Sequence, residues 1–293
     1  MKENEKQPFQ VFETDDLLDI RKDPVFKAVF TKENPAARGA LSRLVSALIG
    51  RDITINRIWA NEQPIDSLGD RKIRYDINCR AENGERINVE MGFYPKIHEP
   101  VRFEFHAGKL FSSQEISGKE RNFNDLKETY QIAILSNKKF FGDNGFFHSF
   151  EYYDPAHKAS LGGRTRIITI ELAKLGKIAE KPADEMSVQE SWAFFFEYLT
   201  DKDKRAKINE ILKLNKGIAM AGESLMTLSQ DEDERMRLYM LEKEIIDYNM
   251  DRAYALKEGR EEGRAEERQY FFELLNQGLS AEQIKQRLEQ KQM

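Results

Sequence analysis

Two short stretches in the first third of the chain alternate between apolar and polar residues. They are IRYDINCRA (73–81) and ERINVEMGF (85–93), joined by Glu82-Asn83-Gly84. Such alternation is typical of a strand with one buried face, and a short connection that contains glycine is typical of a hairpin turn. The pattern therefore predicts a β-hairpin over residues 73–92.

The register of this hairpin depends on the length of its turn. A two-residue Asn-Gly turn would place Asp76 opposite Met91 and mix polar with apolar residues on both faces. A three-residue loop, with Gly84 in the left-handed conformation, separates them. Its pairs are Ala81/Glu85 beside the turn, Asp76/Glu90 and Asn78/Asn88 on a polar face, and Tyr75/Met91, Ile77/Val89 and Cys79/Ile87 on an apolar face. Since register normally follows the buried face, we predict the three-residue loop.

This register brings two carboxylates together. Directly opposed residues have Cβ atoms roughly 4.5–5.5 Å apart, so Asp76 and Glu90 would repel each other unless something neutralised them. A divalent cation would do so, and oxygen-only ligands suit Mg²⁺ or Mn²⁺. Such an ion activates water and stabilises charge on a phosphodiester. The alternative is a solvated hairpin face that carries Asp and Glu without any metal.

The remaining pattern predicts helices and further strands around the hairpin. A helix that Gly50 would end is indicated by apolar residues at helical spacing, namely Ala40, Leu41, Leu44, Val45 and Leu48. We predict strands at 53–60, 128–136, 146–153 and 166–172, and a helix from residue 100 to about 118. After about residue 185 no strand signal remains. This order predicts an α/β or α+β fold with a mixed sheet flanked by helices.

Three parts are expected along the chain: a flexible arm (1–18), a core domain (19–185) and a helical region (186–293). The segment WAFFFEYL (192–199) is too aromatic for an exposed helix, so we predict that it packs on the core. Residues 230–276 are rich in Glu, Arg and Lys and predict a long charged helix. Ser280-Ala281-Glu282-Gln283 is a capping box that predicts a short last helix.

Composition limits the partners and the compartment. The 293 residues carry a formal net charge of −5, so any phosphate-binding patch must be local. Cys79 is the only cysteine, which excludes an internal disulfide. His98, His148 and His157 are scattered and form no metal-ligand spacing with it. The polar start lacks a signal-peptide core and no apolar run could span a membrane, so we predict a cytoplasmic protein.

Several segments, in order, resemble one known family. Asp76 followed by Asn-Val-Glu-Met (88–91) resembles the D…NxEx(Q/K) core of the PD-(D/E)XK nucleases. The other matching segments are RKDPVFKAVF (21–30), RFEFHAGKLFSSQ (102–114), FHSFEYYDPAHKASLGGRTRIITIELAKL (147–175), ALKEGREEGRAEE (255–267) and LLNQGLSAEQI (274–284). Together they cover about residues 20 to 285 and are most similar to the bacterial recombination-promoting nuclease (Rpn-type) and transposase branch.

The resemblance implies a restriction-endonuclease-like mixed sheet and a metal-dependent DNA endonuclease linked to recombination or transposition. It implies that Asp76, Glu90 and Met91 hold Mg²⁺ or Mn²⁺ and that the partner is DNA. The family normally has Gln or Lys two residues after the glutamate, but this chain has Gly92. Glycine cannot orient the attacking water or stabilise phosphate charge, so this position weakens the prediction of full activity.

Other residues could take over the missing role. Lys109 and Gln114, on the helix that follows the hairpin, could supply an amine or an amide, although either could equally be an exposed helix residue. His106 could contact phosphate or transfer a proton, or it could simply be a partly buried helix residue. Asp23 matches the family's opening acid and could face the metal, or it could cap a helix.

Two further functions compete with the nuclease hypothesis. One is a catalytically inactive relative that binds DNA or a protein through the retained fold, which Gly92 favours. The other is an assembly protein whose long charged helix does the work. We predict self-association through residues 230–276, because such a helix cannot be buried fully on one domain and carries Gly259 and Gly263 one turn apart.

Overall fold

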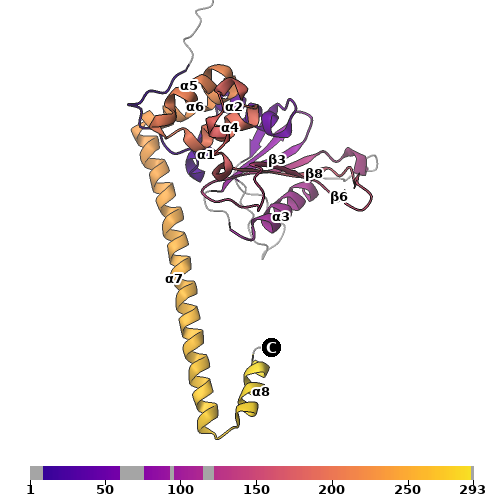
Figure 1. Ribbon diagram of the computed structural model, residues 1–293, viewed down its shortest axis with the longest axis vertical. Coiled ribbons are helices and arrows are strands. Elements are labelled where there is room, and N and C mark those ends of the chain that lie inside the picture. Colours follow the sequence, from indigo (N-terminus) through magenta and orange to yellow (C-terminus); the bar gives the residue numbers. More distant parts are fainter. Residues whose placement is uncertain (1–8, 60–75, 93–95, 115–121, 292–293) are drawn as a thin grey trace, which may run out of the picture. The chain divides into compact units, whose positions relative to one another are not determined.

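A computed structural model of the chain describes residues 9–59, 76–92, 96–114 and 122–291. It divides into two compact units, Met1–Leu238 and Tyr239–Met293 (Figure 1). The first unit contains the sheet and the helices α1 to α6, so α4 (Val188–Tyr198), α5 (Arg205–Leu214) and α6 (Lys216–Gln230) belong to the core rather than to the tail.

Six strands form one mixed sheet in the order β1-β2-β3-β4-β8-β5. Their bounds are β1 Ile55–Trp59, β2 Ile77–Ala81, β3 Arg86–Gly92, β4 Thr129–Leu135, β8 Thr165–Glu171 and β5 Phe147–Phe150. The three central strands β3, β4 and β8 run parallel, and each outer pairing is antiparallel. The predicted α+β fold with a mixed sheet is confirmed.

One face of this sheet is apolar and carries the main core. The helices α1 (Asp23–Thr31) and α2 (Pro35–Ile49) contact strands β1 to β3 on this face, and α4 to α6 pack around them. Trp192 and Phe196 of α4 stack with ring centroids 5.6 Å apart in the same core. The prediction that the aromatic segment packs on the core is therefore confirmed, because large buried rings supply much of the apolar area.

The opposite face of the sheet is polar. Helix α3 (Glu99–Ser112) lies against β3, β4 and β8 on this side, where Phe103, Ala133 and Leu135 form a small apolar cluster with the partly buried Phe140 and Ile167 packed against it. The buried strand residues around that cluster are polar: Asn78, Asn88, Glu90, Gln131, Thr169 and Glu171. We call this side the polar face.

Several predicted boundaries shift in the structure. Helix α3 ends at Ser112, so the predicted extension to residue 118 is too long, and residues 115–118 lie outside the described part. The predicted strand 146–153 is interrupted: after β5, Tyr153–Asp154 (β6) pairs with Ala159–Ser160 (β7) as a separate small hairpin. In the expected N-terminal arm, Val11 is buried and exchanges two hydrogen bonds with Asn209.

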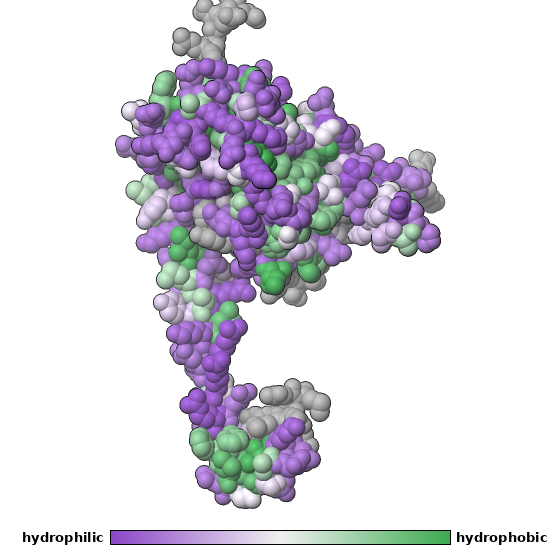
Figure 2. Space-filling view, in the orientation of Figure 1, coloured by the Kyte–Doolittle hydropathy of each residue, from purple (hydrophilic) through white to green (hydrophobic). Residues whose placement is uncertain are grey.

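The second unit is built from two helices. Helix α7 (Glu232–Asn276) is 45 residues long and begins within the first unit, and α8 (Ala281–Lys291) follows a turn at Gly278. Hydrophobic side chains gather where the end of α7 meets α8 (Figure 2), and Leu274 and Ile284 are buried there. The predicted capping box is confirmed by the reciprocal bonds between Ser280 and Gln283. No helix in the described ranges is both long and apolar enough to cross a membrane.

Candidate functional site

The hairpin pairs in the predicted register. Ile77 lies opposite Val89 and Asn78 lies opposite Asn88, which requires the three-residue turn. Gly84 has a φ of 95°, in the left-handed region that glycine occupies without strain. Of the predicted pairs, Tyr75/Met91 involves a residue outside the described part. Alternation along β2 and β3 therefore separates the core side from the polar face as the sequence predicted.

Glu90 lies on the polar face, inside a network of donors. Its Oε2 is 2.8 Å from Arg102 Nη2, and its Oε1 is 2.8 Å from His106 Nδ1. Asn88 Nδ2 donates to the same Oε1 at 2.8 Å and also reaches Gln131. Burial opposes ionisation of Glu90, but the His106 hydrogen bond and the Arg102 charge outweigh it, so its pKa lies below the ordinary value.

Asp76 stands just before β2 and has a different environment. Its Oδ2 accepts the Met91 backbone N–H at 3.1 Å, and its Oδ1 lies 3.2 Å from Lys27 Nζ. Lys27 also pairs with Asp23 at 2.9 Å. Burial, together with the charges of Asp23 and Glu90, raises the pKa of Asp76 to about 7, although Lys27 opposes the shift.

We call Asp76 and Glu90 the acidic pair. Glu90 contributes to the raised pKa of Asp76, and Asp76 accepts the N–H of Met91, the residue that follows Glu90. The pair is unequal, because the Glu90 side chain is 4% exposed whereas that of Asp76 is 20% exposed. The pKa of one carboxylate is thus lowered and that of the other is raised, and only Asp76 is partly exposed to solvent.

The oxygen donors around the acidic pair suit a hard cation, although they form no complete cage. Among the described residues, no three His, Cys, Asp or Glu side chains are grouped closely enough to hold a metal ion by themselves. Asp23 Oδ1 is buried and has no hydrogen-bond partner within the described segments. Met91 packs its side chain into the apolar core, so only its main chain faces the pair. Mg²⁺ commonly binds one or two carboxylates and keeps several waters, which this donor set allows.

Gly92 is placed as predicted, at the end of β3 on the same side as Glu90. A Cβ built there would lie 3.3 Å from Leu135 Cδ2, which belongs to the small apolar cluster under α3. No positive φ is found at this glycine. The position therefore points toward the site but presents no side chain to it.

Neither of the two predicted substitutes for the missing side chain makes a hydrogen bond or an ion pair with Asp76 or Glu90 in the described segments. Gln114 binds the backbone of Lys127 through both ends of its amide and also contacts Thr129 Oγ1. Thr129 pairs with Arg86, four residues before Glu90, which corresponds to roughly 13 Å along the strand. Gln114 is thus a structural link at the other end of the sheet. Lys109 is half-buried, one helical turn beyond His106, and its amine has no ion pair within the described segments.

The other histidines and the cysteine lie outside the site. His98 is the N-cap residue of α3, and His157 binds Asp154 in the small hairpin. Cys79 is buried in the apolar core, where burial raises the pKa of its thiol. His148 belongs to a second polar cluster at the carboxyl end of β8.

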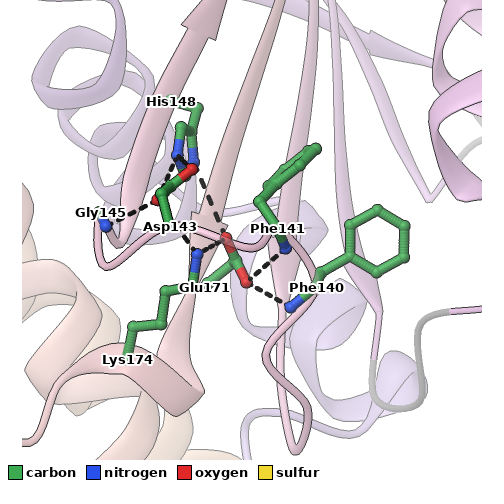
Figure 3. Close-up of polar contacts among 7 residues, drawn as sticks. All are labelled: Phe140, Phe141, Asp143, Gly145, His148, Glu171 and Lys174. Atoms are coloured by element: carbon green, nitrogen blue, oxygen red, sulfur yellow. Dashed lines mark hydrogen bonds and ion pairs between the residues drawn. The ribbon is translucent and has the colours of Figure 1, made fainter.

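That second cluster is built around Glu171 (Figure 3). Its Oε2 accepts the backbone N–H groups of Phe140 and Phe141, and its Oε1 binds Lys174 Nζ at 2.6 Å. Asp143 bridges Lys174 and His148. Because both carboxylate oxygens are satisfied by these groups, the cluster anchors the loop after β4 rather than offering a free ligand.

Sequence reasoning missed the cations of the site. Lys27 and Arg102 contact the acidic pair, and neither was a predicted site residue. A signal was present, because both are charged positions inside segments that carry the family resemblance, RKDPVFKAVF and RFEFHAGKLFSSQ. His106 was weighed as a substitute, and it does bind Glu90 directly.

Comparison with known proteins gives one family. The family model described as "PD-(D/E)XK nuclease family transposase" matches residues 20–257. No curated protein and no solved structure matches the chain.

Proposed function

The chain belongs to the PD-(D/E)XK nuclease family transposases, and from this premise we propose that it is a DNA endonuclease that requires Mg²⁺ or Mn²⁺ and serves recombination or transposition. The observation that carries the proposal is the acidic pair. Asp76 and Glu90 come together on the polar face, where a carboxylate held ionised adjoins one that takes up a proton. Perturbed groups of this kind cluster at functional sites.

We place the cation on Asp76 and Glu90, with the main chain of Met91 beside it. When bound, the ion would supply an activated water and stabilise charge on the phosphate. Arg102 and His106 hold Glu90 in one orientation and keep it ionised, so it is ready to bind a cation. Asp76 must lose its proton before it can bind, and its partial exposure lets the ion reach it from solvent.

Lys27 is the group that we propose for the role that Gly92 cannot fill. It reaches the pair from α1 and places an ammonium 3.2 Å from Asp76 Oδ1, beside the atoms where phosphate charge would develop. An ammonium at that position stabilises an anionic transition state without being part of β3. Lys109 is the alternative donor, and the two are distinguished by comparing Lys27→Met with Lys109→Met in the cleavage assay.

A second function has an observation in its favour. Both oxygens of Glu90 already bind protein groups, and Gly92 removes the usual polar side chain, so a relative that binds DNA without cutting it is the alternative. In that case Arg102 and Lys27 stabilise the carboxylates in place of a metal, and Asp76 and Glu90 serve only the fold.

Plasmid nicking in Mn²⁺ and calorimetric titration with Mg²⁺ test the proposal together. We expect the wild type to bind the ion and nick DNA, and Asp76→Ala to lose both. Removal of one electrostatic group from a hydrolytic site commonly costs on the order of 10²–10³ in rate, and loss of a metal ligand should cost at least as much. Nicking that survives Asp76→Ala would show that the site lies elsewhere. A folded wild type that neither binds Mg²⁺ nor nicks would favour the DNA-binding alternative.

A further inference from the structure

Three arginines stand side by side across the first three strands of the sheet. Arg57 of β1 is paired with Arg80 of β2, and Arg80 is paired with Arg86 of β3. We call these three residues the arginine row. Their guanidinium carbons lie 5.0, 5.6 and 5.2 Å from the centre of the Trp59 ring, so all three side chains make cation–π contacts with one indole.

Such a row is electrostatically unfavourable by itself. Like charges directly opposite each other on adjacent strands destabilise a sheet, and this row contains two such pairs in succession. The indole offsets part of the repulsion through cation–π contacts. Within the described part of the chain, neither Arg57 nor Arg80 forms an ion pair with a carboxylate. In a protein of net charge −5, this concentration of positive charge indicates an anion that binds from outside.

The row lies on the same face as the acidic pair. Trp59 pairs with Asn78 and Asn78 pairs with Asn88, so all three point to the polar face, and Asn88 donates directly to Glu90. Two strand spacings separate Trp59 from Asn88, which is about 10 Å. Along β3 the row lies farther away, because Arg86 is four residues before Glu90, which is roughly 13 Å. One DNA strand spans that distance in about four nucleotides, so a polyanion can contact both the row and the acidic pair.

We propose that Arg57, Arg80 and Arg86 bind the phosphate backbone of a DNA strand and lead it to the acidic pair, while Trp59 positions the guanidinium groups. Guanidinium groups bind phosphate oxygens through two parallel N–H donors, which makes arginine suited to this task. The row spans about 10 Å, which corresponds to roughly three nucleotides along one strand and exceeds a single small anion. Contacts to phosphate position DNA without reading its sequence, so binding through this row is independent of sequence. The identity of the ligand as DNA rests on the proposed function.

The experiment measures binding of a fluorescently labelled DNA duplex by the full chain, without divalent metal, over a series of salt concentrations. The test variants are Arg57→Gln and Arg80→Gln, singly and together. Arg38→Gln is the matched control, because Arg38 is exposed on α2, which packs on the apolar face. The midpoint of urea unfolding is recorded for each variant. We expect Arg57→Gln and Arg80→Gln to be at least as stable as the wild type, since each relieves like-charge repulsion.

We expect each single variant to weaken binding about five- to tenfold at low salt and to lower the slope of log K against log salt by about one. In the double variant the losses of affinity and the changes in slope of the two single variants should add. Arg38→Gln should bind as the wild type does. Trp59→Leu should weaken binding less than the double variant, because the charges remain while their positions are lost. Folded Arg57→Gln and Arg80→Gln proteins that keep wild-type affinity and slope would overturn the proposal.

Parallel nicking assays separate this proposal from the nuclease function. Binding that depends on the arginine row without any cleavage would uphold the row and refute the nuclease. Cleavage by the wild type that is unchanged in the double variant would refute the row and leave the nuclease standing. A wild type that does not bind the duplex at all would overturn the row.

Discussion

The two faces of the sheet have opposite composition, although they alternate along the same strands. On β8, Ile170 points into the apolar core while Thr169 points to the polar face, and both are fully buried. On the polar face, atoms of Asn78, Asn88, Gln131 and Thr169 are buried without a hydrogen-bond partner in the described segments. Unsatisfied buried groups reduce stability, so the polar face contributes less to the stability of the fold than the apolar face does.

The largest effect is expected from a cavity on the apolar face. Ile170→Ala should lower the free energy of unfolding by about 2–5 kcal/mol, because it removes a fully buried side chain whose neighbours relax only partly. Urea unfolding followed by circular dichroism measures this loss. The comparison between faces would fail if Ile170→Ala left stability unchanged but abolished nicking in the remaining folded protein.

A side chain added at Gly92 should act mainly on rate. Gly92→Lys places an amine beside Glu90, and we expect nicking to increase on the order of tenfold to a hundredfold, part of what such electrostatic groups contribute. The new Cβ lies 3.3 Å from Leu135 Cδ2, so a small repacking should cost about 1 kcal/mol of stability.

Gly92→Met is the matched control, since it adds similar bulk without charge. Equal rates for Gly92→Lys and Gly92→Met would contradict the electrostatic argument. Unchanged nicking by Gly92→Lys alone would indicate that Lys27 or Lys109 already fills the role.

The next effect, smaller and of opposite sign to that of Ile170→Ala, concerns Thr169. Its hydroxyl is buried without a partner in the described part of the chain, so Thr169→Val should raise the free energy of unfolding by about 1 kcal/mol. Urea unfolding of the two β8 variants gives the direct contrast between faces. A loss of stability in Thr169→Val similar to that of Ile170→Ala would mean that the polar face is an ordinary core.

The pH dependence of stability tests the environment of Asp76. The folded protein holds this proton more tightly than the unfolded chain, because its pKa rises from 3.8 to about 7 on folding. The resulting stabilisation is complete below the unfolded pKa and is lost as pH rises through about 7. The pKa of Glu90 is lowered on folding, so its ionisation stabilises the protein above the ordinary pKa of a glutamate, and this stabilisation is lost only at more acidic pH. Glu90 therefore does not contribute to the change between pH 5 and pH 8.

We therefore expect the urea midpoint of the wild type to decrease as the pH is raised from 5 to 8. The Asp76→Asn variant should lack this part of the decrease. Mg²⁺ added at pH 8 should restore part of the wild-type midpoint and leave Asp76→Asn unchanged. Parallel curves for the two proteins would show that Asp76 is not perturbed.

The local part of the site could be predicted from sequence, and the long-range part could not. The hairpin register follows from period-two alternation and from Gly84, both of which lie within twenty residues. Lys27 lies on a helix before the hairpin in sequence, and Arg102 lies on a helix after it. Local sequence patterns do not determine which face of each helix packs against which strand. The contacts of Gln114 with Lys127 and Thr129 could not be predicted for the same reason, since they depend on how α3 packs on the sheet.

The arginine row shows the same limit. Alternation places Arg80 and Arg86 on one face of the hairpin, but the register of β1 against β2 has no turn rule to fix it. Residues 60–75 separate β1 from the described start of the hairpin, so the pairing of Arg57 with Arg80 emerged only from the structure.

Removing the second unit should have the smallest effect on the stability of the sheet. Leu238 is buried in the first unit, whereas Leu241, Ile245 and Tyr248 on the following turns of α7 are exposed. A chain ending at residue 238 should therefore keep the free energy of unfolding of the first unit to within about 0.5 kcal/mol of its value in the full chain. It should also lose self-association, because a helix with exposed apolar residues at 4-3 spacing favours pairing with another copy. Light scattering over a concentration series of the two proteins measures this difference. If both proteins are monomers at high concentration, α7 does not mediate self-association. If both self-associate equally, the contact between copies lies in the first unit and not in α7.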